Sequence, residues 1–463
     1  MAKQPSLEYY GNPLVIYKGE GQLTFDSGQV MKCKFKAGQL RTSKVTLLCK
    51  FSDVHHLRNI NSFQGRTSDN CQVSSTDVIM GIPWQEKIEV SDGIQRWAAF
   101  SLGKLMVESL PRERKKPQTL RFGLTNLSFI PIERVNGFPR RVLSLRLNTE
   151  TATYEVVLDP ISDYNERLDK VRTTKGVDVT CEAVVNVGDG QTIQELTQVL
   201  DNLCYILSVA GGTKINWIYR GVYSSDGSLL RRLHAARVTK PYAPLSIIDP
   251  RNPHETKAFI EKVYPVYINK KDSYRLDSGM IDAYLDAKQE ADFLEMRGLK
   301  MVVAMEMIVW HIATVLGMSE KILDESEFKK LRTKLKHLIK SEILQGSQMK
   351  KNRCLVYSKI PELKRCSFRD MLRKIISPEN IDLPLPDDEL ELFIRCRNAL
   401  VHKGDFYCNT ANNRDRVACP PKSTAVGEYF FLVNVLDRMF LKILEYRGTY
   451  IDCSHGFDRA ILQ

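Results

Sequence analysis

The stretch PDDELELFIRCRNALVHKG, residues 386–404, decides the fold of the C-terminal half because it sets charged residues into the pattern of a buried helix. Its apolar residues recur at the spacing of one helical face: Leu390, Phe393, Ile394, Leu400 and Val401. Arg397 falls on that face, and a guanidinium that faces a core needs an anionic partner, either a carboxylate or a phosphate. Asn398 and His402 are four residues apart, so they share one patch beside it. We therefore predict a helix that carries a polar cluster near its end.

Length and composition describe an ordinary globular chain. The 463 residues are 43% hydrophobic and 26% charged, which is enough for two or three domains with substantial cores. The 11 cysteines include no CxxC pair, and no secretory signal precedes them, so we expect reduced thiols and a cytoplasmic location. The histidines and cysteines have no metal-ligand spacing. We expect neither a metal nor a cofactor.

The first half of the sequence is rich in short runs of strand composition, such as residues 21–25, 45–49 and 120–124. A hairpin is expected between 141–147 and 152–158, because Asn, Thr and Glu separate the two runs. One amphipathic helix, from about 192 to 209, is followed by the stop signal Gly211-Gly212. We therefore predict a β-rich N-terminal domain over residues 1–248.

The second half has the pattern of a helical bundle. Repeated prolines between 240 and 253 interrupt regular structure, and we place the domain boundary there. We expect the second helix to break or bend near Gly298. The predicted fold class is α+β multidomain, with an all-α bundle over residues 249–463 after the β-rich domain. The expected helices are 254–268, 278–317, 326–345, 367–377, 386–402 and 426–446.

Residues 301–318 are almost apolar enough to cross a membrane. Glu306 and His311 lie inside this stretch, and each costs about 2 kcal/mol or more at the centre of a bilayer. A central helix of a soluble bundle is also apolar nearly all round, so it accounts for this apolar stretch without a membrane. We therefore expect a bundle helix and no membrane partner.

The net positive charge is concentrated in one stretch. The chain has 67 basic and 55 acidic residues, an excess of 12, and residues 329–374 alone have 15 basic and three acidic residues, which is the same excess. A basic helix is often only a solvated surface, but the concentration of the whole excess here favours a polyanion such as RNA. The basic side of the first helix in this stretch is formed by Lys329, Arg332, Lys336 and Lys340.

Arg397-Asn398, three further residues and then His402, near the end of a helix in a C-terminal bundle, resembles the signature of the HEPN superfamily (higher eukaryotes and prokaryotes nucleotide-binding domain). The last helical segment, 426–447, resembles the closing helix of the ApeA-like bacterial branch, and residues 203–212 resemble part of the N-terminal region of large ApeA-like proteins. The resemblance implies a metal-independent endoribonuclease that acts against phage or as a growth-limiting toxin. It also implies a homodimer joined through the helical domain.

The residues fit that chemistry. RNA supplies its own nucleophile, the 2′-hydroxyl, so the enzyme needs proton-transfer groups and a positive charge at the phosphate. His402 would transfer a proton, Arg397 would bind the phosphate, and Asn398 would orient His402 or the phosphate. One chain has one such histidine, and two copies facing each other would supply two. Arg395 lies seven residues before His402 on nearly the same face, so it is an alternative or additional phosphate ligand.

Other interpretations stay open. The resemblance suggests that Glu306 braces Arg397, although a paired acid is also how an inert core satisfies a buried base. The family's toxin members have a tyrosine two residues after the motif histidine as a modification target, and Gly404 stands there, so control by that route is doubtful. The alternative function is a non-catalytic RNA-binding or scaffold protein. In a third interpretation, the N-terminal domain senses a phage-derived trigger and holds the bundle inactive. The candidate RNA substrates include tRNA.

Overall fold

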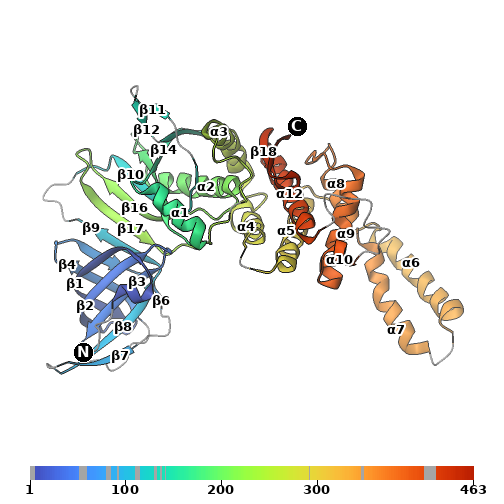
Figure 1. Ribbon diagram of the computed structural model, residues 1–463. Helices are drawn as coiled ribbons and strands as arrows, with labels where there is room; N and C mark the ends of the chain where they lie inside the picture. Colours follow the sequence, from blue (N-terminus) through green and yellow to red (C-terminus); the bar gives the residue numbers. More distant parts are fainter. Residues whose placement is uncertain are drawn as a thin grey trace.

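The computed structural model of the chain shows a β-rich half followed by a helical half, which confirms the α+β fold class (Figure 1). The residues that the structure describes are 6–51, 60–79, 85–90, 93–109, 115–129, 133–135, 138–140, 142–243, 245–290, 292–345, 349–410 and 424–462.

Within the described ranges, 15 strands form one antiparallel sheet, in the order β13-β14-β15-β10-β16-β17-β9-β5-β4-β1-β2-β3-β8-β6, with β7 also paired to β8. Its first lobe, blue in Figure 1, closes around its own apolar core, which includes Leu23, Phe35, Phe63, Phe100 and Leu105. The short helix η1 (Leu7–Tyr10) precedes it. The strands of this lobe are β1 (Pro13–Phe25), β2 (Val30–Leu40), β3 (Val45–Phe51), β4 (Ile60–Thr67), β5 (Gln72–Ser75), β6 (Val78–Ile79), β7 (Gln85–Val90), β8 (Gly93–Leu102) and β9 (Lys104–Glu108).

The second lobe of the sheet, green in Figure 1, is joined to the first where β17 pairs with β9. The predicted hairpin is present as β13 and β14, with Asn148 opposite Thr153, and Arg141 lies outside the described residues. The predicted helix is α2: Thr192 and Glu195 form a capping box at its start, and Gly212 ends it in a left-handed conformation, φ 63°. The elements are β10 (Thr119–Thr125), β13 (Leu143–Asn148), β14 (Thr153–Pro160), α1 (Tyr164–Thr174), β15 (Val179–Asn186), α2 (Ile193–Gly211), β16 (Trp217–Tyr223) and β17 (Leu229–Ala235); β11 (Glu133–Val135) and β12 (Phe138–Arg140) form a separate small hairpin.

The helical half begins with α3, capped by Asn252 with Pro253 in its first turn. The expected break of the long helix falls before Gly298, between α4 and α5. Gly298 itself lies inside α5, where a Cβ would come within 2.8 Å of the Phe406 ring, so glycine permits close packing there. The elements are α3 (Pro253–Lys270), η2 (Leu276–Met280), α4 (Ile281–Ala287), α5 (Leu294–Val315), α6 (Glu325–Leu338), η3 (Ile339–Ile343), α7 (Lys350–Lys359), η5 (Ile360–Lys364), α8 (Phe368–Ile375), α9 (Asp387–Lys403), α10 (Tyr407–Thr410), α12 (Ala425–Ile443), β18 (Gly448–Asp452), η7 (Cys453–His455) and β19 (Asp458–Leu462).

The expectation of an all-α second half is wrong at its end, where β18 and β19 form an antiparallel hairpin. These five-residue strands carry no strong apolar alternation, so they leave little signal in the sequence. The main core continues without interruption from the second lobe into the helices α3, α4, α5, α9 and α12. The predicted boundary at residue 249 therefore crosses a shared core, and that division of the chain stays a prediction.

One helix in the described part of the chain, α5, is long and apolar enough to span a membrane, and half of its apolar window is buried inside the protein. It packs against α4, α8, α9 and α12. Its length and composition are therefore those of a central bundle helix.

Candidate functional site

The candidate site lies on α9, whose sequence is suited to a helix at both ends. Asp387, Asp388 and Glu389 stand at its start and His402 and Lys403 at its end, which matches the helix dipole. Gly404 then ends the helix in a left-handed conformation, φ 70°. The inner face buries apolar side chains against the bundle: Leu390, Leu392, Phe393, Ile394, Cys396, Ala399 and Leu400.

Arg397 lies at the edge of that inner face and is paired with a carboxylate. Its Nε donates to Oε1 of Glu306 on α5 at 2.6 Å, and a second guanidinium nitrogen contacts the same oxygen. The guanidinium also lies over the Phe368 ring, 5.5 Å from the centroid. The side chains of Arg397 and Glu306 are 19% and 30% exposed, so the pair is partly open to solvent. The predicted pairing is confirmed, and its role stays a prediction.

Asn398 and His402 lie on the outer face of α9, and both are exposed. The Asn398 Oδ1 accepts a hydrogen bond from Arg397 Nη1 at 2.9 Å. Among the described residues, His402 has no hydrogen-bond or ion-pair partner. The structure therefore joins Arg397 to Asn398 directly, and it places His402 one turn further along the same face, open to a ligand.

Arg395 shares the outer face of α9 with His402, as the spacing predicted. Its Nη1 donates to the Tyr407 hydroxyl at 3.2 Å, and its Nε lies 4.0 Å from a carboxylate oxygen of Glu391, one turn before it. Glu391 is also paired with Arg369 of α8. The Arg395 side chain is 49% exposed, so of the two arginines it is the one more accessible to a phosphate.

A buried carboxylate positions Tyr407 beside this face. Glu428 of α12 accepts the backbone N–H groups of Tyr407 and Cys408, at 2.8 and 2.6 Å, and so holds the start of α10. Burial raises the pKa of Glu428, while the two N–H groups act in the opposite direction. Burial and the nearby Glu428 also raise the pKa of the Cys408 thiol to about 11, so this thiol stays protonated at neutral pH.

Exposed apolar side chains flank the Arg397–Glu306 pair on both helices. Val303 and Met307, three residues before and one after Glu306 on α5, are 56% and 37% exposed, and Val401, four after Arg397 on α9, is 39% exposed. Large apolar side chains gathered around a polar group are typical of a surface that a partner covers.

The four basic residues predicted to bind RNA do not lie at this site. Lys329, Arg332 and Lys336 are on α6, and Lys340 is in η3, directly after it, within a projection that extends away from the bundle (Figure 1). Lys336 covers the ring of Tyr357 on α7, 5.3 Å from its centroid.

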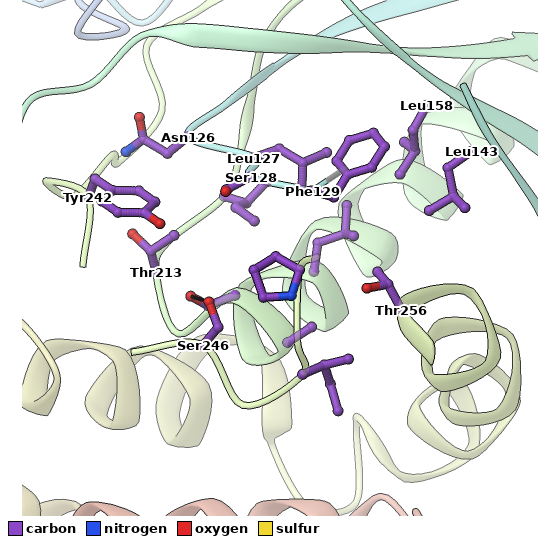
Figure 2. A pocket seen from close by; sticks show the side chains of 16 residues that line it. Asn126, Leu127, Ser128, Phe129, Leu143, Leu158, Thr213, Tyr242, Ser246 and Thr256 are labelled. Carbon is purple, nitrogen blue, oxygen red and sulfur yellow. Dashed lines mark hydrogen bonds between the residues drawn. The ribbon is translucent and has the colours of Figure 1, made fainter. Parts of the chain in front are cut away.

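A small pocket lies beneath the second lobe of the sheet (Figure 2). Polar groups of Asn126, Thr213 and Ser246 line it together with apolar residues from α2 and the segment leading to α3. Its volume is about 20 Å³, room for about one water molecule, so it cannot hold a substrate. Among the described residues no group of three or more His, Cys, Asp or Glu side chains is arranged to hold a metal ion.

Comparison with known proteins gave one match, which lies in the sheet and does not include α9. A family model described as the YopA central domain matches residues 113–243, which include β10 to β17 with α1 and α2. No curated protein matches the chain, and no solved structure matches it. The matched segment is less than a third of the chain, so it marks the second lobe of the sheet as a unit similar to that domain and carries no statement about the candidate site.

Proposed function

We propose that the protein is a metal-independent endoribonuclease of the cytoplasm that cleaves RNA by attack of the 2′-hydroxyl, in defence against phage or as a growth-limiting toxin. The observation that carries this proposal is the exposed row formed by Arg395, Asn398 and His402 on one face of α9, next to a partly open Arg397. A phosphate on this row would meet a cation, an amide and an imidazole within two helical turns.

The two arginines have different parts in this proposal. Arg397 is already neutralised by Glu306 and holds the Asn398 amide, so it acts as a positioning residue. Arg395 is half exposed and its carboxylate neighbour is 4.0 Å away, so it can bind the phosphate and stabilise charge in the transition state. His402 transfers the proton. The basic residues of α6 hold a more distant part of the RNA by charge.

The second proton-transfer group would come from a second copy of the chain. Val303, Met307 and Val401 give the Arg397–Glu306 pair an exposed apolar border, which a two-fold related α5 and α9 could cover. A homodimer of this kind would place two His402 side chains on opposite sides of one RNA strand. The N-terminal lobes would then remain available to sense a phage-derived trigger.

The test is cleavage of total RNA or tRNA by the full-length protein in EDTA. We expect fragments that end in a cyclic phosphate, and we expect His402→Ala to abolish them while RNA binding remains. His254→Ala, which removes an exposed histidine from α3, is the matched control and should cleave as the wild type does. Arg395→Ala should lower the rate by about 100-fold.

Dimerisation is tested in the same preparations by light scattering after size exclusion. Met307→Asp should give monomers without cleavage activity, whereas Ile461→Asp, at a side chain that is 74% exposed on β19, should leave the dimer intact. RNA that stays intact under every condition, with unchanged binding, would favour the alternative function, a non-catalytic RNA-binding or scaffold protein.

A further inference from the structure

The described residues between 320 and 366, namely 320–345 and 349–366, are here called the arm, which projects from the bundle between α5 and α8 (Figure 1). It has its own small core, in which Phe328, Ile339 and Ile360 are buried. Its two ends are joined by the backbone hydrogen bond from Cys366 N to Glu320 O, at 2.8 Å. The arm is therefore an independently packed hairpin of α6 and α7.

The outer surface of the arm is unusually apolar. The arm has 44 described residues, about a tenth of the chain, yet it carries seven of the 18 large apolar side chains that are exposed in the described residues. Leu355 and Val356 on α7 are 61% and 40% exposed. At the far end, Ile343 and Met349 are 63% and 40% exposed. Exposure on this scale marks a surface that a partner covers.

The same surface is strongly basic. The arm contains 13 basic residues, of which 10 are lysines, and six acidic residues, which leaves an excess of seven positive charges. On α7, Lys351 and Lys359 lie one helical turn before and after Leu355, so they border it on one face. At the far end, Lys340 and Lys350 are close in sequence to Ile343 and Met349. The partner must therefore accept aliphatic side chains and ammonium groups side by side.

The combination of exposed aliphatic side chains and lysines distinguishes three candidate partners: a second arm, a nucleic acid and an anionic bilayer. A second arm would bring two like charges together, which is unfavourable. A nucleic acid would pair with the lysines but gain little from aliphatic groups, since bases stack on aromatic rings and guanidinium planes. The arm's aromatic residues Phe328 and Tyr357 are turned to its own core. An anionic bilayer takes both groups, because aliphatic side chains enter the acyl boundary while lysines meet lipid phosphates.

We propose that the outer face of α7 and the far end of the arm bind an anionic lipid surface, with Leu355, Val356 and Ile343 entering it. This is attachment to a surface and not a membrane span, and it departs from the sequence-based expectation that no membrane takes part. It does not depend on the ribonuclease proposal, because Leu355 and Val356 lie on α7, whereas Lys329, Arg332 and Lys336 lie on α6. Lys340, in η3 with Ile343, is the one residue that both proposals use.

The experiment is co-sedimentation of the full-length protein with vesicles of phosphatidylcholine alone and vesicles that also contain phosphatidylserine. The wild type should sediment with the anionic vesicles, and less so in high salt. The double variant Leu355→Ser, Val356→Ser should lower the partition coefficient by about tenfold. The replaced side chains are exposed, so the fold should remain, and circular dichroism checks this. Ile461→Ser removes an equally exposed aliphatic group elsewhere and should bind as the wild type does.

Three results would overturn the proposal. The first is no preference for anionic vesicles. The second is equal sedimentation of the double variant and the wild type. The third is a double variant whose vesicle binding is unchanged but whose other interactions change. Loss of binding to an RNA oligonucleotide would assign the arm to RNA, and a changed oligomeric state would assign it to a second copy of the chain.

Discussion

His234 gives the sharpest prediction of a pH effect on stability. It is fully buried where β17 meets the first lobe, and its Nδ1 lies 2.7 Å from Gln39 Oε1. The Gln39 amide donates to the carbonyls of Ile218 and Ala235, so its oxygen must be the acceptor and Nδ1 carries the proton. The other ring nitrogen, Nε2, then accepts from the Tyr17 hydroxyl at 2.9 Å. Both nitrogens of the neutral ring are therefore satisfied.

Burial, with a smaller contribution from Arg232, lowers the pKa of His234 from its usual 6.5 to about 3. Below pH 6.5 the unfolded chain therefore binds a proton that the folded protein does not, and stability falls as the pH falls. At about pH 5.5 this costs the folded state about 1.4 kcal/mol, and at about pH 7.5 almost nothing. The variant His234→Gln has no such proton, so it is spared this loss.

The assay is guanidinium unfolding of both proteins at about pH 7.5 and about pH 5.5, followed by tryptophan fluorescence, since Trp217 lies on the neighbouring strand β16. We expect the destabilisation caused by His234→Gln to shrink by about 1.4 kcal/mol at the lower pH. His337→Gln removes an exposed histidine and controls for the loss of an imidazole without the buried network. A destabilisation that is the same at both pH values, or larger at the lower one, would refute the reasoning.

Two further substitutions test the packing that supports the site. Lys288→Met removes the ammonium group that lies 2.7 Å from the buried Asp437, so we expect a loss of about 3–5 kcal/mol in unfolding measurements. Burial raises the pKa of Asp437, and Lys288 opposes this rise. Without Lys288, Asp437 takes up a proton more readily in the folded variant than in the unfolded chain, so the loss of stability relative to the wild type should be smaller at about pH 4.5 than at about pH 7.5. Equal losses at the two pH values would contradict this. Gly298→Ala places a methyl group against Phe406 and should cost about 1–3 kcal/mol, measured as a lower midpoint of thermal unfolding. An unchanged midpoint would mean that the contact between α5 and Phe406, the residue before α10, yields easily.

The fold class could be predicted because its signals are local. The helix α2 is marked by Thr192 and Glu195 at one end and Gly212 at the other, and these residues act within a single turn of the chain. The pairing of β9 with β17 joins strands that are far apart in the sequence, and no residue of either strand specifies it. For the same reason the shared core between the second lobe and α3 was not visible as a sequence pattern.

The candidate site was predictable to the extent that it depends on one helix. The spacing of Arg397, Asn398 and His402 fixes their faces. The need of a guanidinium on an apolar face for an anion predicts a partner without naming it, and it was the family resemblance that pointed to Glu306 on another helix. Tyr407 was missed because it reaches Arg395 only through the turn after α9 and the buried Glu428 that holds it. This difference bears on the chemistry. Part of the Arg397 donor set and charge is already taken up by Glu306, and its side chain is 19% exposed, whereas that of Arg395 is 49% exposed. The more accessible cation of this site is therefore Arg395, which lies outside the Arg397-Asn398-His402 motif.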